Sequence, residues 1–263
     1  KGYLTRNGLR GAALLKAASR QNLADERVFS SPEEYQGHYT LEAGGPESYQ
    51  DLARLCQGIA GAEDGAAFLE KALDIPRYIN YLSASAFTQN WDAFNKNRFL
   101  AFDEEGTRKW FVVPWDLDRT LGDHWDWEFD VASQPLYLGT ERFPGTTGWN
   151  RLLDRFLREP ALKKRFEDRL RDLLSETFTE EKLFPILDAL VREIAAEADL
   201  DRAKWGGNPD WRGGIEQLKR YITERRGFLL AELPGGEPRA PRNLKPEEGA
   251  LLDSGESHER NDQ

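Results

Sequence analysis

The segment from residue 89 to residue 123, QNWDAFNKNRFLAFDEEGTRKWFVVPWDLDRTLGD, concentrates side chains that could do chemistry. Asp92 and Asn97 are five residues apart, and Asp116 and Asp118 follow a short apolar run. Carboxylate and amide oxygens are hard ligands that suit Mg²⁺, and a magnesium ion would neutralise an incoming triphosphate. The residue types therefore indicate a cation site that serves a phosphate-bearing substrate.

The local charge supports the same interpretation. Residues 110–130 hold six acids and one arginine, within a chain whose formal net charge is -10. Such a surface would repel a phosphate substrate unless cations intervened. The overall charge also argues against non-specific nucleic-acid binding, which relies on Lys and Arg to neutralise phosphates.

A β-hairpin is expected to position these side chains. Residues 99–102 and 110–113 are aromatic or β-branched runs, and the DEEGTR sequence between them suits a turn. Asn97 precedes the first strand and Asp116 follows the second. Both side chains are therefore expected at one end of the hairpin, with Asp92 in the polar loop before it.

Helical periodicity surrounds the hairpin. SYQDLARLCQGIAG at 48–61 and LDIPRYINYLSASAF at 73–87 have apolar residues three and four positions apart, and the second helix has a cap-like Asp74. From 149 to 233 the pattern is helical almost throughout. One apolar stripe there comprises Leu183, Leu187, Leu190 and Ile194, and a second comprises Ile215, Leu218, Ile222 and Leu229.

The chain divides into three predicted parts. Residues 1–45 read as strands and loops, residues 46–233 as a helical region containing the hairpin at 98–114, and residues 234–263 as a disordered tail rich in Pro, Gly and charge. With 263 residues, 39% of them hydrophobic, the chain is long enough for a substantial core. No apolar run is long enough to span a membrane, and the single cysteine excludes an intrachain disulfide.

The spacing of Asp92, Asn97 and Asp116 matches the division of labour in protein kinases, where a loop Asp accepts the substrate proton and the Asn and a later Asp hold metals. Spacing alone is weak evidence, because Asp and Asn are common turn residues. The combination of QNWDAFNKN, the hairpin and PWDLDRTLG, however, resembles the signature of the spore coat protein H (CotH) kinase family. LLKA near residue 16 is similar to the lysine-bearing strand of that family. DRAKWGG and ITERRGFL resemble its C-terminal portion.

The resemblance implies an α+β, divergent protein-kinase-like fold and an ATP- and Mg²⁺-dependent (or Mn²⁺-dependent) protein serine kinase. By resemblance, Asp92 is the catalytic residue, Asn97 and Asp116 are metal ligands with Asp118 as a further candidate, and Lys16 contacts the nucleotide. Family members in spore coats act on basic, Ser-rich proteins, so such a substrate and a spore-associated or extracytoplasmic location are expected. The chain is also expected to begin after the hairpin that covers the nucleotide in family members.

Tryptophans cluster around the candidate site, and one of them could stack on adenine. Most are expected to pack in the core, as large aromatic side chains usually do. We assign Trp115 to the nucleotide. The other four tryptophans of this five-residue cluster are Trp91, Trp110, Trp125 and Trp127.

Other interpretations of these residues remain open. Asp92 could cap a turn, Asp116 and Asp118 could be ordinary polar residues at a strand end, and Lys16 could be a solvated lysine on an edge strand. Two alternative functions are consistent with the pattern. One is a catalytically silent coat, adhesion or binding protein, and the other is a glycosidase that uses two of the acids.

Overall fold

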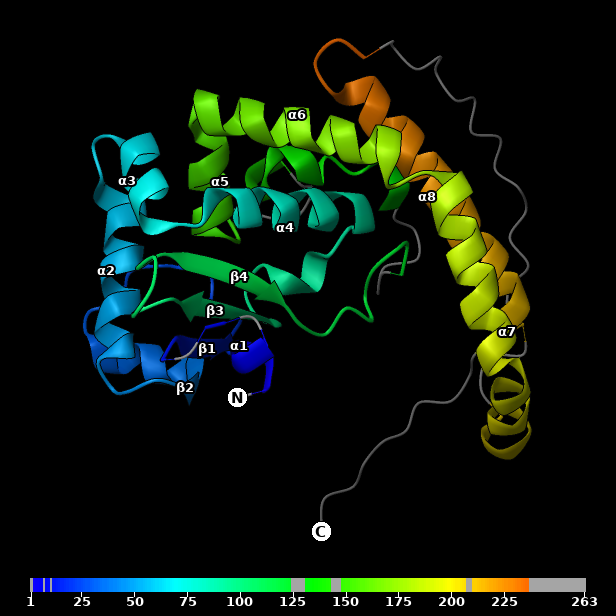
Figure 1. The fold of residues 1–263 in the computed structure, drawn as a ribbon, viewed down its shortest axis with the longest axis horizontal. Coiled ribbons are helices and arrows are strands. Elements are labelled where there is room, and N and C mark those ends of the chain that lie inside the picture. The colour runs from blue at the N-terminus through cyan, green and yellow to red at the C-terminus, as the bar shows by residue number, and fades with distance from the viewer. Residues whose placement is uncertain are drawn as a thin grey trace.

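The computed structural model describes residues 2–6, 8–9, 11–123, 131–142, 148–206 and 210–236 (Figure 1). Residues 237–263 of the predicted tail lie outside the described residues, as do Trp125 and Trp127. The described chain contains helices and one antiparallel sheet, which confirms the α+β part of the predicted fold class.

Four strands form the sheet in the order β2-β1-β3-β4. The strands are β1 (Ala13–Ala17), β2 (Tyr39–Ala43), β3 (Arg98–Phe102) and β4 (Trp110–Pro114). β3 and β4 form the predicted hairpin, with Phe99 opposite Val113 and Phe102 opposite Trp110. The Asp103 carboxylate accepts hydrogen bonds from the Thr107 N–H and hydroxyl and so fixes the turn. β3 also pairs with β1, so the hairpin and the N-terminal strands share one sheet.

The helices follow the predicted periodicity closely. The second predicted helix begins after Asp74, whose carboxylate accepts a hydrogen bond from the Arg77 N–H as an N-cap. Two helices were not predicted: α3, which lies between the two predicted ones, and the five-residue α1, within residues 1–45, which were predicted as strands and loops. The helices are α1 (Gly2–Arg6), α2 (Ser48–Gly61), α3 (Gly65–Ala72), α4 (Ile75–Thr88), α5 (Arg151–Arg158), α6 (Pro160–Glu176), α7 (Glu180–Trp205) and α8 (Trp211–Glu232).

The main core lies between the sheet and the helices. The strand alternation of β1 turns Ala13, Leu15 and Ala17 towards this core. α4 lies between the sheet and α6, while α2 packs at one end of the sheet (Figure 1). A smaller cluster on the opposite face of the sheet includes Leu4 from α1 and Phe111 from β4.

The two C-terminal helices form an antiparallel pair at one side of the molecule (Figure 1). Only the first half of the predicted α7 stripe packs on the core, through Leu183 and Leu187. Leu190 and Ile194 are 52% and 53% exposed because α7 continues beyond the body. No helix in the described part of the chain is both long and apolar enough to cross a membrane.

One buried arginine joins α8 to the end of α4. The Arg225 guanidinium is fully buried and donates to the carbonyl oxygens of Ala86, Ala132 and Gln134. The Ala86 oxygen is one of the last carbonyls of α4, which have no partner within their own helix. Arg225 thus fixes the end of the helix that leads directly into the candidate site.

We expect Arg225→Leu to lower the free energy of unfolding by about 3 kcal/mol or more, because it leaves the buried carbonyl oxygens of Ala86 and Ala132 without their donor. Arg220→Leu, at an exposed position of the same helix, should change it by less than about 0.5 kcal/mol. Urea unfolding of both variants measures the difference. Equal effects at the two positions would contradict this role of Arg225.

Candidate active site

The loop from Trp91 to Asn97 carries the candidate catalytic residue between α4 and β3. α4 ends at Thr88, its C-cap residue Gln89 adopts the left-handed conformation, and a short 3-10 turn at Trp91–Ala93 follows. The Gln89 side-chain amide donates to the carbonyl oxygens of Val131 and Gln134. The start of the loop is therefore held by buried hydrogen bonds.

Four consecutive carbonyl groups in this loop each accept a hydrogen bond from a residue outside the loop. Arg98 Nη1 donates to the oxygen of residue 93 over 2.6 Å and to that of residue 96 over 3.3 Å. Asn150 Nδ2 donates to the oxygen of residue 94, and the Ala24 N–H to that of residue 95. These contacts hold the loop backbone in a single conformation around Asp92.

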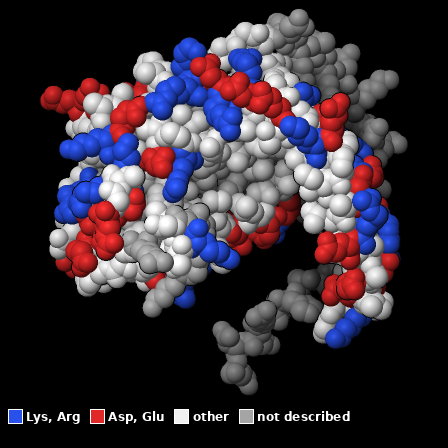
Figure 2. All heavy atoms as spheres, viewed as in Figure 1, with Lys and Arg blue, Asp and Glu red and all other residues white. Residues whose placement is uncertain are grey.

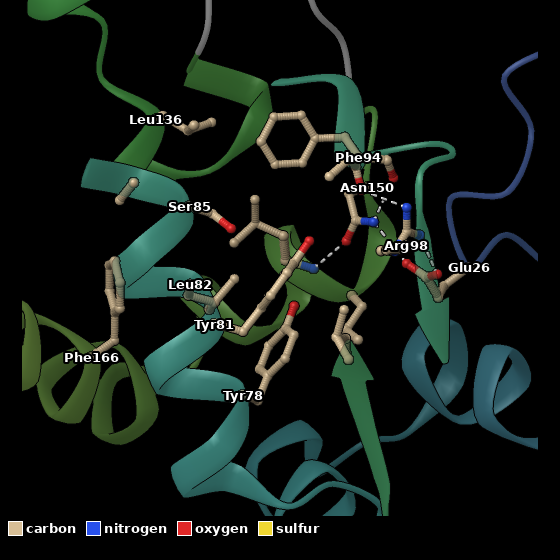
Figure 3. Close-up of a pocket in the computed structure, with 15 residues that line it drawn as sticks. Glu26, Tyr78, Tyr81, Leu82, Ser85, Phe94, Arg98, Leu136, Asn150 and Phe166 are labelled. Carbon is tan, nitrogen blue, oxygen red and sulfur yellow. Dashed lines mark hydrogen bonds and ion pairs between the residues drawn. The ribbon is translucent and has the colours of Figure 1, made fainter. Parts of the chain in front are cut away.

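A buried ion pair supports these contacts. Arg98 Nη2 contacts Glu26 Oε1, and Asn150 Nδ2 donates to Glu26 Oε2 over 2.7 Å. Figure 3 shows these three side chains pointing toward one another beside an internal cavity of about 20 Å³, which has room for one water molecule. Each of the three is at most 5% exposed.

The charges of Glu26 and Arg98 depend on their mutual contact, because burial disfavours the charged form of each. Burial raises the pKa of Glu26 above its ordinary value, whereas Arg98 and the Asn150 amide favour the ionised carboxylate. Burial by itself would lower the pKa of Arg98, but the Glu26 carboxylate, together with Tyr39 and Tyr81, raises that pKa above its ordinary value. We therefore describe the contact as an ion pair with the proton on Arg98.

Both oxygens of the Asp92 carboxylate have partners on the same loop. Lys96 Nζ lies 3.0 Å from Asp92 Oδ1, and Asn97 Nδ2 donates to Asp92 Oδ2 over 2.6 Å. Asn97 has a φ of 54°, in the left-handed region that Asn adopts more readily than most residues. Because its amide nitrogen faces Asp92, its Oδ1 oxygen points elsewhere and is the atom of Asn97 that could bind a metal ion.

Asp92 lines a polar cleft of about 580 Å³. A second carboxylate in the cleft, that of Asp25, is 1% exposed and accepts two hydrogen bonds from the Arg27 guanidinium, at 2.7 and 2.8 Å. The remaining lining residues are Asn22, Trp91, Asn95, Lys96, Arg119, Gly148, Trp149 and Arg151.

The two residues that we assigned to the nucleotide are neighbours. Lys16 Nζ lies 5.1 Å from the centre of the Trp115 ring, close enough for a cation–π contact. The Trp115 ring also packs edge-to-face on Phe99, at 5.4 Å between ring centres, and remains 48% exposed. Lys16 is opposite Phe99 in the β1–β3 pairing, so these three side chains share one face of the sheet.

The strand register places the predicted metal ligands Asn97 and Asp116 at one end of the sheet. Arg98 is opposite Pro114, so Asn97 precedes β3 at the same end at which Asp116 follows β4. The Asn97 N–H donates to the Ala17 oxygen, which brings the end of β1 to this point as well. Asp116, like Asn97, has a left-handed backbone, with a φ of 58°.

The structure does not join all the predicted site residues. Asp116 and Asp118 are exposed and line neither the cleft beside Asp92 nor the internal cavity. Within the described residues, no three His, Cys, Asp or Glu side chains are grouped to hold a metal. The oxygen atoms of Asn97 and Asp116 nevertheless fit Mg²⁺, which takes only one or two protein carboxylates alongside water and substrate phosphates. Their roles stay predictions.

Sequence reasoning did not find the residues that hold the loop. Glu26, Arg98 and Asn150 are separated by 72 and 52 positions, and no local pattern connects them. The one available signal was an arginine opening the apolar strand RFLAF. An arginine at the start of a buried strand requires partners, but the sequence does not identify them.

The fold and the site together define an α+β protein in which a polar cleft lies beside the hydrogen-bonded loop that carries Asp92. A family model described as CotH kinase protein matches residues 1–229, so the chain belongs to that family. The inner spore coat protein H of Bacillus subtilis (strain 168) is 30% identical over 163 residues, which cover 62% of this chain and 42% of that protein.

Two proteins of the fungus Rhizopus delemar (strain RA 99-880) are also similar. Its invasin CotH7 is 23% identical over 144 residues, which cover 54% of this chain and 24% of the relative. Its spore coat protein homolog 1 is 24% identical over 136 residues, which cover 51% of this chain and 22% of the relative. The match thus spans less than half the length of each of these three relatives.

We expect Arg98→Met to cost about 3–5 kcal/mol of unfolding free energy, because it leaves the Glu26 carboxylate buried without its cation. Combining it with Glu26→Gln should recover about 2 kcal/mol relative to the sum of the two single changes. Urea unfolding of both single variants and the double variant measures this coupling. Additivity within about 0.5 kcal/mol would show that the two side chains do not act as a pair.

Proposed function

We propose that this chain transfers the γ-phosphoryl group of ATP to a serine hydroxyl of a protein, with Mg²⁺ or Mn²⁺ as the cofactor. The observation that carries the proposal is the arrangement of Asp92 at the cleft. Its carboxylate is fixed by Lys96 and Asn97, on a loop whose backbone is fixed in turn by Arg98 and Asn150. Membership of the CotH kinase family supports the same activity.

In this proposal Asp92 orients the acceptor. A serine hydroxyl that enters the cleft donates its hydrogen bond to the Asp92 carboxylate, which directs the serine oxygen towards the phosphorus. The serine oxygen forms a bond to the γ-phosphorus, the bond from that phosphorus to the bridging oxygen breaks, and ADP leaves. The serine proton passes to Asp92 and then to water. Lys96, 3.0 Å from Asp92, adds positive charge beside the transferred group.

Asn97 and Asp116 would hold the metal ion through the Asn97 Oδ1 atom and the Asp116 carboxylate. When bound, the ion offsets the negative charge of the triphosphate and of the transition state. Asn97 would have a second task, because its Nδ2 atom orients Asp92. Lys16 and the exposed face of Trp115 would contact the nucleotide, where the ammonium binds phosphate and the ring stacks on the base.

The catalytically silent alternative has one specific observation in its favour, since a relative from Rhizopus delemar is named an invasin. In that case the cleft would bind a partner without ATP. The glycosidase alternative has less support, because Asp25, the second carboxylate in the cleft, is already held by Arg27 through two short hydrogen bonds.

Asp92→Asn separates binding from chemistry. In the chain with its natural flanking sequence, we expect it to leave the affinity for Mg²⁺–ATP within a few fold and to lower phosphoryl transfer by about 100-fold or more. Asp168→Asn on the surface of α6 is the matched control and should leave both unchanged. Calorimetric titration with ATP and Mg²⁺, beside transfer of radiolabelled phosphate to a serine-containing protein, gives the two readouts. Full transfer activity in Asp92→Asn would exclude the proposed role.

Asp116→Ala should instead weaken Mg²⁺-dependent ATP binding and phosphoryl transfer together, because it removes a metal ligand. The same two assays apply, with ATP binding measured at several Mg²⁺ concentrations. Unchanged ATP affinity at every Mg²⁺ concentration would remove Asp116 from the metal site. If Asp118→Ala had this effect instead, the ligand would be Asp118.

A further inference from the structure

A second cleft, of about 490 Å³, adjoins the one that contains Asp92. Arg27 and Arg151 line both clefts. The two hollows are therefore neighbours, and together they extend from Asp92 along one side of α5. The second cleft is otherwise lined by Glu26, Val28, Ile59, Ala60, Arg155 and Arg158.

We call the two adjoining clefts the double cleft. Its charge is opposite in sign to that of the chain. Six of its lining residues are basic, and three are acidic, within a chain of net charge -10. The three acids are all paired, Glu26 with Arg98, Asp25 with Arg27 and Asp92 with Lys96, which leaves four of the basic lining residues, Arg119, Arg151, Arg155 and Arg158. The face shown in Figure 2 differs, because basic and acidic side chains are interspersed there over α6 and along α7.

Three of the arginines share one face of α5. Arg151, Arg155 and Arg158 are separated by four and three positions, which places them in a row along the helix. The Arg151 side chain is 51% exposed and its Nε lies 3.7 Å from Asp25 Oδ2, too far for a strong hydrogen bond. Arg158 is 61% exposed and contacts Glu141. Arg155, between them, is held by Glu159 and the Ala62 oxygen, whereas Arg151 and Arg158 can turn towards an incoming anion at little cost.

We infer that the double cleft binds an acidic segment of the acceptor protein, with carboxylate or phosphorylated side chains next to the target serine. The inference rests on the proposed function, since Asp92 defines where the serine lies. A row of guanidinium groups binds carboxylates and phosphates through paired hydrogen bonds. The preferred acceptor is thus opposite in charge to the basic coat proteins that the family resemblance implied.

The nucleotide is a less suitable occupant of these clefts. Lys16, Trp115 and Asp116, the residues assigned to ATP and its metal, line neither of them. Lys16 lies instead on β1, opposite Phe99, and Trp115 and Asp116 directly follow β4. The basic row and the predicted nucleotide residues therefore belong to different parts of the site, as a two-substrate transfer requires.

Peptide binding tests the inference without any phosphoryl transfer. Short fluorescent peptides carry alanine in place of the acceptor serine, flanked by aspartate and glutamate, by phosphoserine, or by lysine and arginine. Fluorescence anisotropy at roughly physiological ionic strength compares them on the chain with its natural flanking sequence. We expect at least one anionic peptide to bind about tenfold or more tightly than the basic peptide. The two anionic peptides distinguish carboxylate from phosphate recognition.

The double variant Arg151→Gln with Arg158→Gln should weaken binding of the anionic peptide by about tenfold. Lys164→Gln with Arg165→Gln, on the surface of α6, removes the same charge and should change it by less than about twofold. Tighter binding of the basic peptide, or equal effects of the two double variants, would overturn the inference. The inference would also be overturned if the Arg151 and Arg158 double variant lost as much affinity for Mg²⁺–ATP as for the anionic peptide. Competition by an oligonucleotide as strong as competition by the peptide would overturn it as well.

Transfer assays with the matching serine peptides separate this inference from the proposed function. If phosphate is transferred, the Arg151 and Arg158 variant should raise KM for the anionic peptide and leave kcat unchanged. Equal transfer to anionic and basic peptides would contradict the inference and leave the proposed function standing. Selective binding of the anionic peptide without transfer under any condition would contradict the proposed function and leave the recognition of acidic segments standing.

Discussion

The buried ion pair between Glu26 and Arg98 is the interaction on which the candidate site depends. Each charge is at most 2% exposed, so each requires the other, and the shared partner Asn150 brings in the start of α5. The Nη1 atom of Arg98 donates to two backbone oxygens of the loop that carries Asp92, and its Nη2 atom also donates to the Ala24 oxygen. Three segments distant in sequence are thereby joined at one point, and the orientation of the catalytic candidate follows from their junction.

The same junction organises the charges around the site. α5 begins at Arg151, directly after Asn150, so fixing Asn150 also fixes the start of the row of arginines. Asp25 and Arg27 flank Glu26 in sequence and line the cleft beside Asp92. The loop that carries Asp92 and the arginines of α5 therefore line adjoining clefts. This is a suitable arrangement for holding an anionic acceptor segment while one of its hydroxyl groups faces Asp92.

Much of the fold followed from local patterns, because helices and hairpins are specified by nearby residues. The hairpin at 98–114 and the capped helix after Asp74 follow from periodicity and turn chemistry. The pairing of β1 with β3 did not, because strand order depends on contacts between residues more than 80 positions apart. The outer half of the α7 stripe was also misleading, since periodicity shows that a helix is amphipathic but not how much of it meets the core.

The candidate site was predictable only in part, because it too depends on contacts between residues that are distant in sequence. Asp92 and Asn97 lie on one loop, five residues apart, so their spacing in the sequence was enough to suggest that they interact. Lys16 and Trp115 meet through the sheet, and no local spacing connects them. The arginines that line the clefts have no local signature, because Lys and Arg are ordinary surface residues wherever no partner is visible.

The central claim is that the Glu26–Arg98 pair holds the loop around Asp92, and hydrogen exchange tests it most directly. Wild type and Glu26→Gln are compared by mass spectrometry at times too short for globally protected amides to exchange. The account predicts exchange in residues 91–97 that is faster by about tenfold or more, while α6 exchanges as in the wild type. Unchanged exchange in residues 91–97, or equal acceleration in α6, would contradict it.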